Sequence, residues 1–62
     1  MPVITIAGNP NISIENKRKM VKEVSESVAK AYDLPIEAIT VLVQAIPADS
    51  IGVAGGLLSD RE

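Results

Sequence analysis

Two short runs of apolar residues predict β-strands. Residues 2–7 are rich in β-branched side chains, with Ile4 and Ile6 on one face and Val3 on the other. Because both faces of this strand carry apolar residues, we expect both to be covered. Residues 39–45 repeat the alternation and predict a second strand of similar length.

Between these runs, residues 14–32 have the apolar spacing of an amphipathic helix. Ser13 is the expected N-cap, and Pro35 prevents the helix from continuing past the residue before it. A strand, a helix and a second strand in this order predict a βαβ unit with parallel strands. At 1.5 Å per residue the helix is about 28 Å long, so it overhangs a two-stranded sheet.

Lys17 interrupts the apolar side of the helix. It lies three residues after Ile14 and four before Val21, so it projects from the apolar stripe. Two interpretations remain open. Its stem covers apolar surface while the ammonium reaches water, or the ammonium points into a pocket near the end of the first strand.

The last part of the chain, residues 46–62, has a different character. Several Pro and Gly residues prevent any long element, yet apolar residues such as Val53 and Leu57 lie between them. We expect an arm, or a small hairpin around residues 52–56, that packs on another subunit. The predicted fold class is therefore α/β: a βαβ protomer with two parallel strands, one long helix and a C-terminal arm or hairpin, in a single domain over residues 1–62.

Composition favours an oligomer. A chain of 62 residues buries little surface, and scaffolds of this size need a disulfide, a metal or a partner. The chain has no Cys and no His, which leaves neither a disulfide nor a usual zinc site. With 47% hydrophobic residues, it carries more apolar surface than one thin α/β layer can cover.

Charge and hydropathy limit the classes of partner and the cellular location that we expect. The net charge is −2, and the run Lys17-Arg18-Lys19 is too short for a nucleic-acid footprint, so no nucleic acid is expected. No apolar stretch is long enough to span a membrane, and no signal peptide is visible. The absence of Cys fits a reducing compartment, so we expect a cytoplasmic protein.

Pro2 is the first candidate for chemistry. Met1 precedes a small residue, the context in which the initiator is usually removed, and its removal leaves Pro2 as a secondary amine at the end of a strand. An α-amino group titrates near ~7.7–8.0, and burial lowers that pKa further. Since the chain has no His and no Cys, this amine is the group that needs the smallest shift in pKa to act as a base near neutrality.

Taken together, these features resemble the 4-oxalocrotonate tautomerase family over essentially the whole chain. The resemblance is carried by Pro2, by the βαβ order and by three stretches of sequence: residues 22–28, Leu34-Pro35 and residues 51–57. It implies a homohexamer, a trimer of dimers, and a reaction in which Pro2 moves a proton between the enol and keto forms of a small keto-acid-like substrate. It implies no cofactor and no metal.

The chain departs from the family at its substrate-binding positions. Well-studied members hold substrate carboxylates with two arginines, and the matching positions here are Ile12 and Thr40. Neither can hold an anion bidentately as Arg does. The family's aromatic pocket wall falls on Ile51. The resemblance thus assigns Thr40 and Ile51 to the substrate pocket, and Lys17 is our first candidate for the missing cation.

Other candidates for polar contacts with the substrate are Asn9, Asn11, Gln44 and Arg61. The loss of both arginines favours a second hypothesis, a non-catalytic hexameric protein that binds small molecules or acts as a scaffold. Retention of Pro2 favours the tautomerase. A further variant uses Pro2 as a nucleophile, because a secondary amine forms iminium adducts with carbonyls.

Overall fold

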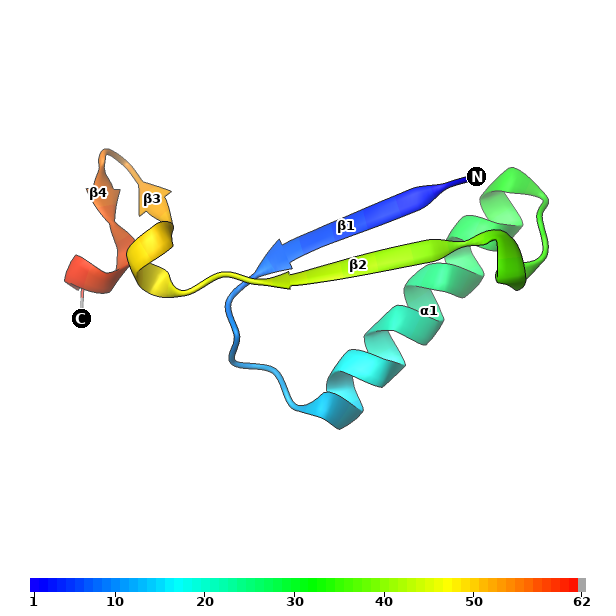
Figure 1. The fold of residues 1–62 in the computed structure, drawn as a ribbon, viewed down its shortest axis with the longest axis horizontal. Coiled ribbons are helices and arrows are strands. Elements are labelled where there is room, and N and C mark those ends of the chain that lie inside the picture. The colour runs from blue at the N-terminus through cyan, green and yellow to red at the C-terminus, as the bar shows by residue number, and fades with distance from the viewer. Residues whose placement is uncertain (62) are drawn as a thin grey trace.

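The computed structural model describes residues 1–61, and its centre is a βαβ unit (Figure 1). Strands β1 (Val3–Gly8) and β2 (Thr40–Ala45) form a parallel two-stranded sheet, joined through helix α1 (Ile14–Tyr32). The predicted order of elements and the parallel pairing are confirmed, although each strand begins one residue later than expected and β1 ends one residue later. Glu62, the last residue of the predicted domain, lies outside the described residues.

Helix α1 has the predicted bounds because both of its ends are capped. The Ser13 hydroxyl oxygen accepts a hydrogen bond from the Asn16 N–H at 3.1 Å. At the other end Asp33 adopts a left-handed conformation, φ 55°, and the Leu34 N–H donates to the Ala29 carbonyl at 3.0 Å. A short 3₁₀ helix, η1 (Ile36–Ala38), then leads the chain into β2.

Only one face of the sheet is covered. The register pairs Ile4 with Val41 and Ile6 with Val43, and these half-buried side chains face α1. On the opposite face the largest side chains, Val3 and Leu42, remain about half exposed, at 51% and 48%. Residues 1–61 therefore leave the second face of the sheet without the expected cover.

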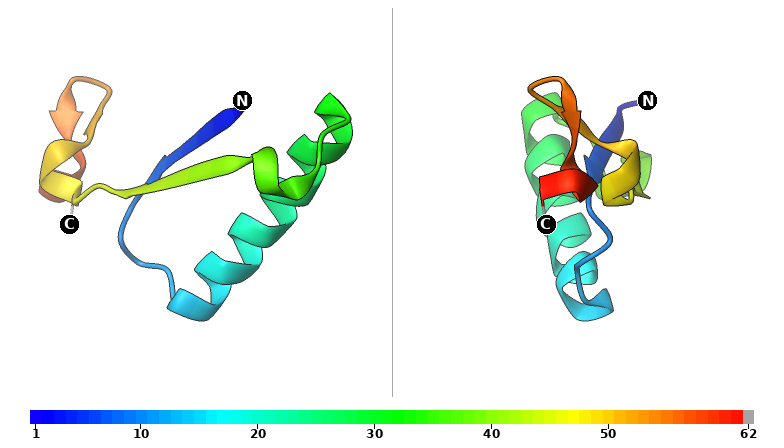
Figure 2. Two further views of the ribbon diagram at one scale, coloured as in Figure 1. Left: turned by 45° about the vertical axis from the view of Figure 1, so that its right-hand side comes forward. Right: turned by 90° about the vertical axis from the view of Figure 1, so that its left-hand side faces the viewer.

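The C-terminal arm (residues 46–61) lies beyond the end of the sheet (Figure 2). It contains the predicted hairpin, formed by β3 (Gly52–Val53) and β4 (Gly56–Leu57), which pair antiparallel. Two 3₁₀ helices that the sequence pattern did not predict, η2 (Ala48–Ser50) and η3 (Leu58–Arg61), flank it. The Arg61 guanidinium donates to the Val53 carbonyl at 3.3 Å and closes the arm on itself.

The hairpin turn carries a strained residue, which gives a stability prediction. Ala54 and Gly55 both have positive φ, 54° and 83°, as a two-residue type I′ turn requires. A side chain with a Cβ disfavours this conformation, whereas Asn tolerates it. Ala54→Asn should therefore stabilise the protein by about 1 kcal/mol, measured as a higher urea midpoint at one fixed protein concentration. Ala54→Val should lower the midpoint, and equal midpoints for the two variants would contradict this account.

A single chain has almost no core. Among residues 1–61 only Ser25 and Ala29 are buried, and no side chain is completely enclosed. The exposed surface is 4739 Å², against about 3,800 Å² expected for a folded monomer of this mass. The radius of gyration is 14.7 Å, against about 11 Å for a compact domain of this length. Both values support the predicted oligomer, because association can bury the excess surface.

Within residues 1–61, α1 is the only long helix, and its sequence is too polar for it to cross a membrane.

Candidate active site

Pro2 lies at the head of β1 with Thr40 beside it. The Thr40 N–H donates to the Pro2 carbonyl at 3.2 Å, which extends the β1–β2 ladder to the residue before the strand. Pro2 is half buried, whereas Met1 is 90% exposed. The ladder thus holds Pro2 in place through its carbonyl and leaves its nitrogen at the free end of the sheet.

The surroundings of Pro2 within one chain are apolar and slightly acidic. The last turn of α1 and the η1 segment lie at the same end of the sheet as Pro2 (Figure 1). Leu34 and Ile36 are partly exposed there, at 39% and 44%. The charged residues of these segments are Lys30, Asp33 and Glu37, all exposed. One chain alone therefore offers little at this end to hold an anionic substrate.

The remaining predicted site residues lie at the opposite end of the sheet. Lys17 is in the first turn of α1, and Ile12 precedes that helix, which begins near the level of the carboxyl ends of the strands (Figure 1). Ile51 belongs to the arm, which lies beyond those ends. Six residues of strand separate the two ends, a span of about 20 Å. The structure thus brings Thr40 to Pro2 but does not bring Lys17, Ile12 or Ile51 to Pro2 of the same chain.

A cavity of about 340 Å³ lies at this second end. Ile6, Ile12, Met20 and Val43 contribute apolar lining, and Asn9 and Asn11 contribute polar groups. The Asn9 side-chain oxygen accepts from the Asn11 N–H at 3.0 Å, which shapes the loop over the cavity. Ile12, the position matching one family arginine, therefore lines a pocket, as does each of the two asparagines that the sequence suggested.

Lys17 lies on the side of α1 that faces the sheet, as its spacing predicted. The half-buried or buried positions of the helix recur every three to four residues from Lys17 through Met20, Val24 and Val28. Among the charged residues in 1–61, Lys17 is the only one that is not fully exposed. Its position fits both sequence interpretations, a stem that covers apolar surface and a cation near a pocket.

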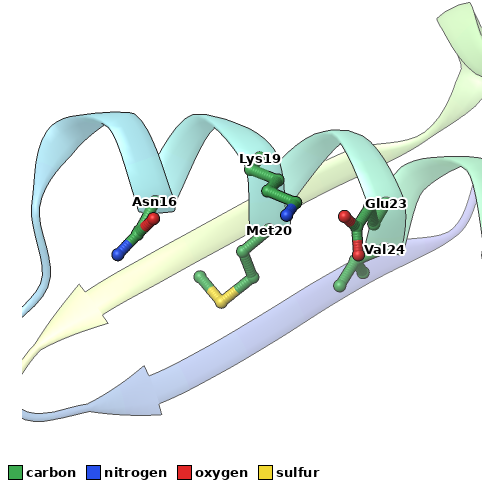
Figure 3. Close-up of a pocket in the computed structure, with 5 residues that line it drawn as sticks. All are labelled: Asn16, Lys19, Met20, Glu23 and Val24. Atoms are coloured by element: carbon green, nitrogen blue, oxygen red, sulfur yellow. The ribbon is translucent and has the colours of Figure 1, made fainter.

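A second groove of about 340 Å³ runs along the flank of α1 and was not predicted (Figure 3). Met20 and Val24 are directed toward the strands, and Lys19 and Glu23 lie beside them. Asn16 completes the lining. The i, i+4 spacing of these residues was visible in the sequence, but the helical pattern alone did not show that the sheet leaves this flank open.

Comparisons with known proteins agree on one family. The model of the Tautomerase family, described as tautomerase enzymes, matches residues 2–61. A probable tautomerase of Halalkalibacterium halodurans is 36% identical over 61 residues, which cover 98% of this chain and 100% of that relative. A 2-hydroxymuconate tautomerase of Bacillus subtilis strain 168 is 34% identical over 62 residues, the full length of both chains.

The fold agrees as well. The crystal structure of YwhB, a homologue of 4-oxalocrotonate tautomerase, superposes with a TM-score of 0.93 at 33% identity, covering 98% of this chain and 100% of that one. The match of sequence and fold extends from Pro2 at the head of β1 to the end of the arm. This chain therefore belongs to the tautomerase family of enzymes and is an isomerase.

Proposed function

We propose that the chain, once Met1 is removed, interconverts the enol and keto forms of a small keto-acid-like substrate with the Pro2 amine as its base. The neutral nitrogen takes a proton from one atom of the substrate and returns it to another, so the substrate is isomerised and the amine regenerated. The observation that carries this proposal is the half-buried position of Pro2 at the free end of β1, where the family match also begins.

The chemistry of the chain supports this assignment. The sequence holds no His and no Cys, so the α-amine is the group whose ordinary pKa lies nearest neutrality. The partial burial of Pro2 disfavours the protonated amine and increases the neutral fraction. The N–H of Thr40 is used by the ladder, which leaves its hydroxyl to contact a substrate bound at Pro2.

We further propose a homohexamer built as a trimer of dimers, with each site shared between chains. The excess exposed surface and the protruding arm support this assembly. In it, Ile51 forms a pocket wall at Pro2 of another subunit, because the arm lies far from Pro2 of its own chain. The non-catalytic hexamer is not favoured, since the relatives are named as tautomerases.

The pH dependence of the rate tests the role of the amine. The intact mass first establishes that Met1 is absent. Ketonisation of an enol such as 2-hydroxymuconate should then accelerate as pH rises and reach a plateau, because only the deprotonated amine accepts a proton. We expect an apparent pKa between about 6 and 8 in kcat/KM. A rate that does not vary between pH 5 and 9, in a protein that remains folded, would contradict an amine base.

A further inference from the structure

We propose that Lys17 serves the Pro2 site of a neighbouring copy of this chain, where it binds a carboxylate of the substrate. This inference rests on the proposed function of Pro2. It makes Lys17 a residue that sets substrate preference from across a subunit interface, and it names an anionic enol as the substrate class.

Lys17 cannot serve the Pro2 site of its own chain. The two residues lie at opposite ends of the sheet, with the whole of β1, about 20 Å of strand, between them (Figure 1). A lysine side chain is far shorter than that distance. Any contact between Lys17 and a substrate held at Pro2 therefore has to come from a second chain.

Lys17 also differs from the other cations of the helix. It is the one charged residue in 1–61 that is partly buried, and none of the side-chain hydrogen bonds among these residues involves it. It lies one turn before Met20, which lines the cavity at the carboxyl ends of the strands. A partly buried cation that lies one helical turn from an apolar cavity, with no hydrogen-bonded anion among residues 1–61, is suited to an anion that arrives from outside.

The open side of β1 shows how a second copy can bring Pro2 to this end. Helix α1 packs more closely against β2 than against β1. The groove on the flank of α1 is lined by helix residues, of which Met20 and Val24 are directed toward the strands (Figure 3), and β1 has one unpaired edge in the two-stranded sheet. An open edge pairs readily with another strand. A copy related by a two-fold axis meets the same groove, with its own Met20 and Val24 against these residues.

The charges of the groove are self-complementary under that two-fold axis. Lys19 and Glu23 flank it one helical turn apart. In an antiparallel arrangement Lys19 lies opposite Glu23 of the partner subunit, and the reverse pair forms at the same time. The excess exposed surface of the single chain is consistent with burial in such an interface.

Antiparallel pairing of two β1 edges has a direct consequence for the site. The head of each strand comes to lie beside the tail of the other, so Pro2 of the partner subunit approaches Gly8 and the cavity near Lys17. The negative charges of Asp33 and Glu37 near Pro2 of one chain then lie opposite the basic first turns of α1 of the other. At the Pro2 end of one chain the described cation, Lys30, is fully exposed, and the neighbour supplies a partly buried one.

Substitutions at Lys17 separate the effect of its charge from the packing of its aliphatic stem. Lys17→Met keeps an unbranched apolar side chain, so the helix should still pack, but the charge is lost. We expect KM for 2-hydroxymuconate, a dicarboxylate, to rise roughly tenfold to a hundredfold with kcat little changed, and Lys17→Arg to restore most of the affinity. Lys22→Met, which removes an exposed cation of the same helix, should change KM little. An unchanged KM in Lys17→Met would overturn the proposal.

Mixed assemblies test whether Lys17 acts across the interface. One chain carries Lys17→Met; the other is wild type at Lys17 but has an uncleaved extension ahead of Pro2, which converts the Pro2 nitrogen to an amide. The two are unfolded together, refolded and assayed well below the wild-type KM. Sites that combine Pro2 of the first chain with Lys17 of the second should restore activity above that of either chain alone. If Lys17 acted within its own chain, no mixed site would be complete and the activity would not rise.

These outcomes are distinguishable from a failure of the proposed function. If Pro2 is not the base, the extended chain alone remains active, whatever Lys17 does. If Pro2 is the base and Lys17 has only a packing role, the extended chain is inactive, Lys17→Met is less stable with an unchanged KM, and mixing restores nothing.

Discussion

A chain whose N-terminal amine is blocked should lose nearly all tautomerase activity. Blocking is achieved by an uncleaved extension ahead of Pro2 or by retention of Met1, and in both cases the Pro2 nitrogen becomes an amide with no basic lone pair. A general base typically contributes about 10²- to 10⁴-fold to the rate, so a loss of that size is expected in kcat/KM. The measurement is the rate of ketonisation of 2-hydroxymuconate by chains whose termini have been identified by mass.

The control is the same extended chain after a protease has removed the extension, since activity should return with the free amine. Pro2→Ala is a weaker test, because it leaves a primary amine that still accepts protons. An electrophilic substrate analogue should inactivate the processed protein in step with labelling of the N-terminus. Full activity in a chain shown by mass to be blocked would refute the amine mechanism.

The fold could be predicted because the patterns that define it are local. Alternating apolar residues in two short runs and a helical repeat over residues 14–32 define the elements, and the Ser13 cap fixes where the helix begins. The hairpin near Gly55 followed from glycine content alone. In the strands the prediction erred only by a residue at the ends, where hydrogen bonding and not hydropathy decides the bounds.

The site could be predicted only in part, because its residues are distant in space. Pro2 was a candidate because of its chemistry, and Thr40 was assigned through the family resemblance; the register of the parallel strands places Thr40 beside Pro2. The separation of Lys17 from Pro2 by the length of the sheet was not visible, because a sequence pattern gives the face of a helix and not the end of the fold at which a residue lies. The same holds for Ile51, whose position depends on how far the arm extends from the sheet.

The second face of the sheet carries apolar residues that a single chain leaves exposed. Apolar residues on both faces of the first strand indicated two covers, and α1 supplies only one. In the proposed hexamer, the hydropathy pattern of the first strand reports burial in the assembly and not in the protomer. Val3 and Leu42, each about half exposed in the single chain, form apolar surface that is suited to contact with another subunit.

Leu57→Asp should dissociate the oligomer and unfold the chain in the same step. Leu57 lies in β4 and is 43% exposed in the single chain, on an arm that has no core of its own. If that arm packs on a neighbouring subunit, the substitution buries an unpaired carboxylate at every copy of the contact, which costs several kcal/mol each time. Because a single chain has almost no core, the separated protomer should not remain folded. Val53→Asp, on the adjacent strand, should behave in the same way.

Light scattering and circular dichroism measured on the same samples test this coupling. Wild type should be a hexamer with helical signal, and Leu57→Asp should show low mass and lost helix together. Leu57→Met, which conserves volume and apolarity, is the matched control and should remain assembled. A Leu57→Asp protein that stays hexameric would show that the arm is not an interface. One that is monomeric yet folded would show that the βαβ unit is stable alone, against the surface excess of the single chain.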